Sequence, residues 1–251
     1  MSLLLSCSFA SETVTEKAYF QLHKTMKTNP SEVWVWDNHY PTNREGFVRD
    51  ICMKYGFIYM HSGENIGLYA AYRRLIGHIH EFKRYEETVL FYDGDGNPQQ
   101  DDWHLALEQV LTGNTRVVHS TLLNQTINRE LRERGFDFET INGIKCMVPH
   151  TACTNTICGF NLRWLERVGG LTGKYFYGGN EIAMWPEYSA IERWVFLQDF
   201  IEDSVSMRDL HDWQYHQYKL LYAHKGMDMS FADYLKTNPS RIYDLEKTIF
   251  G

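Results

Sequence analysis

Segments typical of β-strands and of α-helices alternate through the first half of this chain, and this alternation limits the folds open to it. The predicted strands span residues 3–9, 32–37, 57–60, 87–92 and 116–119. The predicted helices between them span about 12–27, 43–54, 67–80 and 101–111. Such a pattern predicts βαβ units, and therefore an α/β fold with a mostly parallel, Rossmann-like central sheet flanked by helices. Ligands of such sheets bind beyond the carboxyl ends of the strands.

The second half is less regular. A long helix is expected from about 181 to 200, with Pro186 in its first turns, where proline is better tolerated than further in. A further helical region is expected at about 210–224, followed by a polar helical tail over 226–251. Because no repeat or low-complexity linker interrupts the chain, we predict a single domain over residues 1–251.

Composition excludes some classes of function. The net charge of -7 argues against a surface that coats nucleic acid generally. No apolar run approaches membrane-spanning length, so no transmembrane segment is expected. The cysteines are odd in number and lack the paired spacing of zinc sites, which predicts reduced, mostly buried thiols in a cytoplasmic protein. They are Cys7, Cys52, Cys146, Cys153 and Cys158.

The most informative motif is Asp93-Gly94-Asp95, which directly follows an apolar strand. Two closely spaced carboxylates at a strand end can hold a divalent cation, and such a cation can neutralise a diphosphate. A calcium loop is excluded, because Pro98 and His104 stand where that loop needs glycine and glutamate. A simple acidic turn stays open as the alternative, since Asp-Gly is also common turn chemistry.

Other candidate ligand groups lie earlier in the chain. Asp37 ends the strand 32–37, where it could meet a base or ribose, or simply stabilise a turn. Asn65 is a candidate cap for the helix that follows it. On that helix Arg73 and Arg74 either face phosphates or are solvated. No dinucleotide-binding glycine fingerprint is present, so a nicotinamide cofactor is not expected.

Together these pieces resemble the GT-A fold glycosyltransferases, in particular glycosyltransferase family 2. That family shows a Val-Asp-Asn type element, then Asn-x-Gly opening a helix, then a strand ending in Asp-x-Asp and a proline. The counterparts here are 36–38, 65–67 and 93–98. A second block, 159–170 followed by 177–181, matches the family's helix, Val-Gly-Gly and Gly-Gly-Glu-Asp. The resemblance covers roughly residues 3–225, with the donor half at about 1–120 and the acceptor half at about 121–225.

The resemblance implies roles for the donor side. Asp37 would contact the uracil-type base or the ribose of a sugar nucleotide. Asp93 would lie against ribose and metal, and Asp95 would ligate Mn²⁺ or Mg²⁺ between the two phosphates. Ser8 and Gly94 would join the same donor site, alongside the asparagine and arginines named above.

The resemblance also implies an acceptor side. In relatives the acidic pair after Gly-Gly supplies the catalytic base. The pair here is Asn180-Glu181, so Glu181 is the candidate base that deprotonates an acceptor hydroxyl. Gly179, Asn180 and Trp185 would contact the acceptor.

Some positions depart from the family's pattern or leave a choice open. The family often adds a downstream histidine as a metal ligand, for which His211 is the better placed candidate and His216 the alternative. Relatives carry Pro-Thr after the first strand, whereas this chain has Ser6-Cys7-Ser8. The family's arginine in the Asn-x-Gly helix is replaced by Tyr72, with the two arginines beside it.

The sequence thus predicts a metal-dependent glycosyltransferase that moves a sugar from a nucleoside-diphosphate sugar, with UDP-sugars favoured, to an acceptor hydroxyl with inversion. The acceptor stays open between a glycan, a small molecule and a hydroxylated base of phage DNA. Two alternatives come from other classes: a nucleotidyltransferase, and an inactive module that binds sugar nucleotides.

Overall fold

The computed structural model describes residues 3–40, 42–82, 88–113, 116–153, 156–168 and 188–203. Within these ranges the chain forms a nine-stranded sheet flanked by helices. The strands are β1 (Leu3–Ser8), β2 (Glu32–Asp37), β3 (Ile58–His61), β4 (Thr88–Asp93), β5 (Val117–Leu123), β6 (Phe136–Ile141), β7 (Ile144–Pro149), β8 (Cys158–Asn161) and β9 (Arg193–Ile201). The helices are α1 (Glu12–Thr25), α2 (Phe47–Tyr55), α3 (Leu68–Glu81), α4 (Trp103–Leu111), α5 (Gln125–Arg134) and α6 (Leu162–Arg167).

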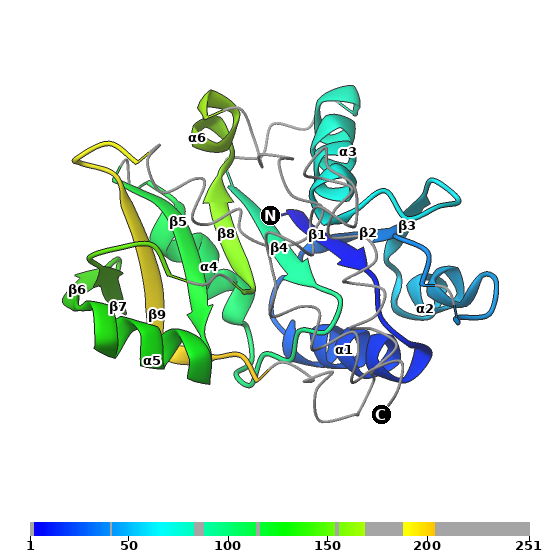
Figure 1. Cartoon of the computed structure of the whole chain (residues 1–251), viewed down its shortest axis with the longest axis horizontal. Helices are drawn as coiled ribbons and strands as arrows, with labels where there is room; N and C mark the ends of the chain where they lie inside the picture. Colours follow the sequence, from blue (N-terminus) through cyan, green and yellow to red (C-terminus); the bar gives the residue numbers. More distant parts are fainter. Residues whose placement is uncertain are drawn as a thin grey trace, which may run out of the picture.

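The strands follow the order β3-β2-β1-β4-β8-β5-β9-β7-β6 across the sheet (Figure 1). The first four are parallel neighbours, as the alternating sequence predicts. Strand β8 is antiparallel to both β4 and β5, and β7 is antiparallel to both β9 and β6. All the other strands therefore run in the same direction as β1. The predicted α/β class is confirmed, and the sheet is mixed, with its antiparallel pairs in the second half of the chain.

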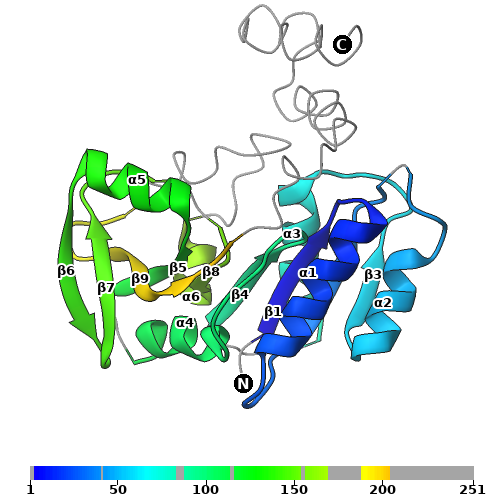
Figure 2. The ribbon, with the colours of Figure 1, turned by 90° about the horizontal axis from the view of Figure 1, so that it is seen from below.

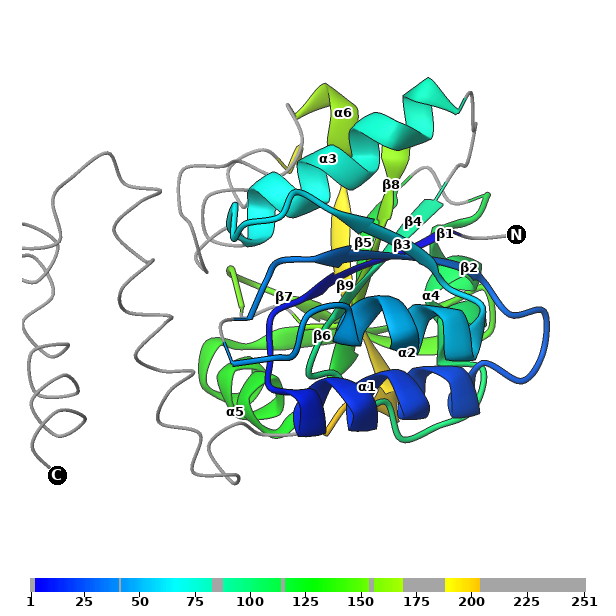
Figure 3. The same cartoon turned by 90° about the vertical axis from the view of Figure 1, so that its right-hand side faces the viewer.

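Helices cover both faces of the sheet. Helices α3 and α6 lie on one side, and α1, α2 and α4 lie on the other (Figures 1 and 3). Alternate residues of β1 pack against the helices on the two faces of the sheet. Leu4 packs in the cluster that includes α1, whereas Leu3 and Leu5 pack with Leu75 of α3. This alternation follows from the two-residue period of a strand, and it explains why β1 is apolar on both faces.

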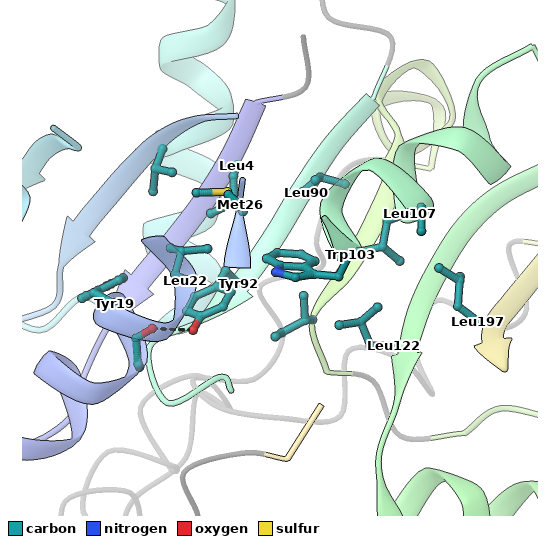
Figure 4. Packing of buried hydrophobic residues seen from close by; sticks show 14 of the residues in the cluster. Leu4, Tyr19, Leu22, Met26, Leu90, Tyr92, Trp103, Leu107, Leu122 and Leu197 are labelled. Atoms are coloured by element: carbon teal, nitrogen blue, oxygen red, sulfur yellow. Dashed lines mark hydrogen bonds between the residues drawn. The ribbon is translucent and has the colours of Figure 1, made fainter. Parts of the chain in front are cut away.

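The largest core cluster supports the end of β4. Trp103, at the start of α4, is fully buried and donates from Nε1 to Thr25 Oγ1 at 3.0 Å. Figure 4 shows it between Tyr92 on one side and Leu107 on the other. The Tyr92 hydroxyl lies within 2.8 Å of the carbonyl oxygen of Ala18 in α1. These contacts tie β4 to α1 and α4, so the turn that follows β4 starts from a fixed position.

The second half of the chain corrects one prediction. The expected helix over 181–200 is wrong where the structure describes it, because Arg193–Ile201 forms β9. Trp194 and Phe196 pack with α5, whereas Val195 and Leu197 pack in the α1 and α4 cluster. When both faces of a segment are apolar, its apolar residues show no regular spacing along the sequence, so the sequence of a buried strand cannot be told from that of a buried helix. Residues 181–187 and the helices predicted beyond 210 lie outside the described residues.

The two ends of the sheet are formed by different elements. Strand β3 with α2 forms one end, and the hairpin β6–β7 with α5 forms the other (Figure 2). The first-half elements agree with their predicted ranges within a few residues, except that α2 begins at Phe47 rather than 43 and β5 continues to Leu123.

The structure also bears on the predictions about the cysteines and about membrane-spanning segments. All five cysteines are free and buried, as expected for reduced thiols. Over the described ranges, the helices are too short or too polar to cross a membrane.

Candidate active site

Acidic side chains gather at the carboxyl edge of the parallel strands. Strand β1 lies between β2 and β4, each of which ends in an aspartate. Near the end of β1, Ser8 lies opposite Asp37 of β2 and Cys7 lies opposite Asp93 of β4. The two aspartates are therefore two strand spacings apart, about 10 Å between backbones. The edge location that the sequence predicts for both residues is confirmed.

The turn after β4 is held close to the end of β1. The Gly96 N–H donates to the Asp93 carbonyl oxygen at 2.8 Å, and the Tyr92 hydroxyl lies 2.6 Å from the Gly96 carbonyl oxygen. A Cβ atom at Gly94 would lie 2.8 Å from the backbone oxygen of Cys7. Only glycine allows this approach, so residue 94 sets how near the Asp93 and Asp95 backbone comes to β1.

Asp37 is held by two donors. Its Oδ1 accepts the His39 N–H at 3.0 Å, and its Oδ2 accepts the Tyr59 hydroxyl at 3.1 Å. Beside it lies a cavity of about 400 Å³ whose walls include Arg49, Tyr59 and His61. The Tyr59 and His61 rings stack with centroids 5.3 Å apart. A partly exposed carboxylate in the wall of such a cavity is placed to accept a hydrogen bond from a ligand.

Asparagines connect β2 to the start of α3. Asn38 is fully buried, its N–H donates to the Ser8 carbonyl oxygen at 3.0 Å, and its Oδ1 accepts the Ile66 N–H at 2.9 Å. The helix cap is Gly67, at φ +86°, so the prediction that Asn65 caps α3 is wrong. Asn65 Oδ1 instead accepts the Gly67 N–H in the turn before the helix. Its short side chain reaches only two residues onward, before the helix begins.

Helix α3 presents a tyrosine, not an arginine, to the β4 end. The Tyr72 hydroxyl lies 3.3 Å from both Asp93 Oδ1 and the Tyr92 carbonyl oxygen. Its ring packs edge-on against Phe91 with centroids 4.8 Å apart. Arg73 and Arg74 follow on the exposed side of α3. Their phosphate contact stays a prediction.

The chemistry of this edge fits a hard divalent cation. Burial first, and then the Asp93 and Asp37 carboxylates, raise the pKa of the Cys7 thiol well above its usual value, so it stays neutral and is a poor ligand. The carboxylate oxygens of Asp37 and Asp93 are ligands of the kind that suits Mg²⁺ and Mn²⁺. No group of three or more His, Cys, Asp or Glu side chains arranged for a metal occurs in the part of the chain that the structure describes.

The structure leaves several predicted residues without a tested role. Ser8 is buried at the end of β1. The acceptor-side residues Gly179, Asn180, Glu181 and Trp185, and the candidate metal ligand His211, all lie outside the described residues. The sequence analysis gave no role to Tyr59 and did not predict the contacts of Asn38 and Tyr72. Asn38 lies in the 36–38 motif and Tyr72 stands at the family's arginine position, but neither signal indicates which groups these side chains contact.

Neither a protein-family model nor a curated protein matches this chain in sequence. Solved structures do match. The mannosyltransferase PcManGT from Pyrobaculum calidifontis, in complex with GDP-Man and Mn²⁺, superposes with a TM-score of 0.64 at 14% identity, over 87% of this chain and 59% of that one. GalNAc-T7 with UDP, GalNAc and Mn²⁺ gives 0.62 at 10% identity, over 81% of this chain and 43% of that one. S. aureus TarS 1–349 in complex with UDP gives 0.54 at 16% identity, over 93% and 68%.

The chain adopts the GT-A fold. The fold named by the sequence resemblance is thereby confirmed. At these identities the similarity concerns the fold, and the GT-A chain here spans about 59% and 43% of the first two matched proteins. In the GT-A chain the edge that carries Asp37 and Asp93 is the ligand edge expected of parallel α/β sheets.

Proposed function

We propose that this GT-A chain is a metal-dependent glycosyltransferase that takes its sugar from a nucleoside-diphosphate donor. One observation carries the proposal: Asp37 and Asp93 flank the end of β1 at the carboxyl edge of the sheet, with Asp95 two residues further along a tightly packed turn. The similarity to PcManGT with GDP-Man and Mn²⁺, and to GalNAc-T7 and TarS with UDP, supports it.

The donor is proposed to lie across the end of β1. Asp37 accepts hydrogen bonds from the base or ribose, since a carboxylate can only accept. Asp93 meets the ribose on the other side of β1, and Asp95 lies nearest the diphosphate. Asn65, Arg73 and Arg74 are proposed to contact the donor from the side of α3. A UDP-sugar is the proposed donor class, supported by the UDP complexes of two matched structures.

Asp93 and Asp95 would hold Mn²⁺ or Mg²⁺, and His211 is the proposed further ligand. When bound, the cation neutralises the charge that builds on the departing diphosphate. The two carboxylates are the only part of this set within the described residues, and their oxygen chemistry fits the ion. The buried turn around Gly94 and Gly96 lies close to the end of β1, across which the donor is proposed to lie.

The acceptor is proposed to approach from the second half of the chain. Glu181 takes the proton of the acceptor hydroxyl as the new glycosidic bond forms. Direct attack of that oxygen on the anomeric carbon breaks the bond to the diphosphate and inverts the configuration. Gly179, Asn180 and Trp185 are proposed to contact the acceptor. The Glu181→Gln variant should bind donor like the wild type and transfer no sugar.

A donor screen tests the proposal. The protein is titrated with UDP-sugars and GDP-sugars, with and without Mn²⁺, while thermal stabilisation and nucleoside-diphosphate release are followed. We expect stabilisation that needs both metal and one donor, and its loss in Asp95→Asn. The matched control is Asp101→Asn, an exposed aspartate that pairs with Lys27 away from this edge. If no donor stabilises the wild type, or if Asp95→Asn binds as well as Asp101→Asn, the proposed function is wrong.

A further inference from the structure

Tyrosine side chains reach the two aspartates of this edge from opposite sides of β1. Tyr59 comes from β3 and touches Asp37, and Tyr72 comes from α3 and touches Asp93. The inference drawn from them rests on the proposed function, because it concerns how the same donor site is held in shape.

Strand register explains the Tyr59 contact. Strands β2 and β3 are parallel with Val35 opposite Tyr59 and Asp37 opposite His61. Residues two apart on a strand share a face, so Tyr59 lies diagonal to Asp37 on the same side of the sheet. Its hydroxyl donates to Oδ2 at 3.1 Å while the His39 N–H occupies Oδ1. Each oxygen keeps a lone pair for a ligand, so the pair of donors fixes the carboxylate and leaves it able to accept.

Helix packing explains the Tyr72 contact. Tyr72 lies on the buried face of α3, only 3% exposed, against Phe91 of β4. From there its hydroxyl lies 3.3 Å from Asp93 Oδ1 and 3.3 Å from the Tyr92 carbonyl oxygen. The hydroxyl thus lies between the Tyr92 carbonyl oxygen and the Asp93 carboxylate at the end of β4, which restrains the Asp93 side chain relative to α3 and β4.

The Tyr59 hydroxyl is suited to donating. Burial, followed by the neighbouring Asp37 carboxylate, raises the pKa of Tyr59. The Tyr59 hydroxyl therefore keeps its proton near neutral pH and can donate to Asp37. A hydrogen bond from a hydroxyl to a carboxylate is a stronger contact than one between neutral groups.

We infer that Tyr59 and Tyr72 are positioning residues of the donor site: Tyr59 orients Asp37 for the nucleoside, and Tyr72 orients Asp93 for the cation and ribose. The two roles are separable, because the aspartates lie on opposite sides of β1. Removing the Tyr59 hydroxyl should weaken binding of the nucleoside alone, and removing the Tyr72 hydroxyl should weaken binding of the cation alone.

The test uses the phenylalanine variants Tyr59→Phe and Tyr72→Phe, which keep the ring and remove the hydroxyl. The matched control is Tyr19→Phe, a fully buried tyrosine whose hydroxyl lies 2.9 Å from Ser6 Oγ. Among the residues that the structure describes, it makes no hydrogen bond to a carboxylate. Calorimetry measures the dissociation constant of UDP without metal, and then the Mn²⁺ concentration needed for tight UDP binding. Both contacts are longer than a usual O–H···O hydrogen bond, so we expect a change of about three- to tenfold, below the full effect of a hydrogen bond to a charged group.

Tyr59→Phe should weaken metal-free UDP binding, and Tyr72→Phe should raise the Mn²⁺ requirement without changing metal-free UDP binding. If the tyrosines were purely structural, each variant would have a lower unfolding temperature. Metal-free UDP affinity and the Mn²⁺ requirement would then both change to the same extent, or both stay unchanged. The inference is overturned if both variants bind UDP and Mn²⁺ like Tyr19→Phe while Asp95→Asn still fails. If the wild type itself binds no UDP with Mn²⁺, the proposed function falls, and the inference with it.

Discussion

Alanine in place of Gly94 tests whether the end of β1 and the acidic turn are packed as tightly as the structure indicates. The new Cβ would meet the Cys7 carbonyl oxygen at 2.8 Å and the Ser8 Cα at 3.1 Å. Both are backbone atoms of a strand that pairs on both sides, so neither can swing away. Ordinary contact begins near 3.4 Å, so the turn or the strand must move by about 0.6 Å. Overpacking of this kind costs about 1–3 kcal/mol.

Urea denaturation measures that cost, and UDP binding with Mn²⁺ measures its effect on the site. The matched control is Gly77→Ala in α3, where a Cβ meets nothing within 4 Å. That variant should gain about 0.5–1 kcal/mol, since glycine is unfavourable inside a helix. Gly94→Ala should lose stability and bind UDP and Mn²⁺ more weakly, because Asp93 and Asp95 move relative to Asp37. Wild-type stability together with wild-type binding in Gly94→Ala would refute the reasoning.

Other predictions concern the core and the thiols. Trp103→Ala should lower the free energy of unfolding by about 3–5 kcal/mol in urea titrations, because it empties a buried site and leaves Thr25 without its donor. Gly159→Ala, whose Cβ would lie 2.7 Å from Leu90 Cδ2, should cost stability yet leave UDP binding unchanged; equal loss of binding would contradict it. Burial raises the pKa of Cys52 to about 12 from 9.0. Iodoacetamide at pH 8 should therefore label the folded protein far more slowly than the unfolded protein by mass spectrometry. Because the unfolded thiol loses its proton first, the free energy of unfolding should fall as pH rises from about 9 toward 12.

The acidic edge could be predicted from the sequence because its signals are local. In β2 and β4 a short apolar run is followed directly by an aspartate, so the end of each strand is visible as the first polar residue after the run. That reasoning placed Asp37 and Asp93 at one edge, and the pairing of Ser8 with Asp37 and of Cys7 with Asp93 confirms it. The roles of these aspartates remain proposals.

The second half could not be read in the same way. In Arg193–Ile201 the residues that face α5 and those that face α4 are both apolar, so no period separates a strand from a helix. Only the neighbouring strands β5 and β7 decide, because they supply the hydrogen bonds that a strand needs.

The sequence by itself determined the α/β alternation and the acidic residues that end its strands, since both depend on neighbours a few positions apart. Only the tertiary structure decided which side chains hold those aspartates. Tyr59 reaches Asp37 through strand register, and Tyr72 reaches Asp93 through the packing of α3 against β4. Contacts between residues about twenty positions apart depend on how elements are placed in space, and no local pattern of residues encodes that placement.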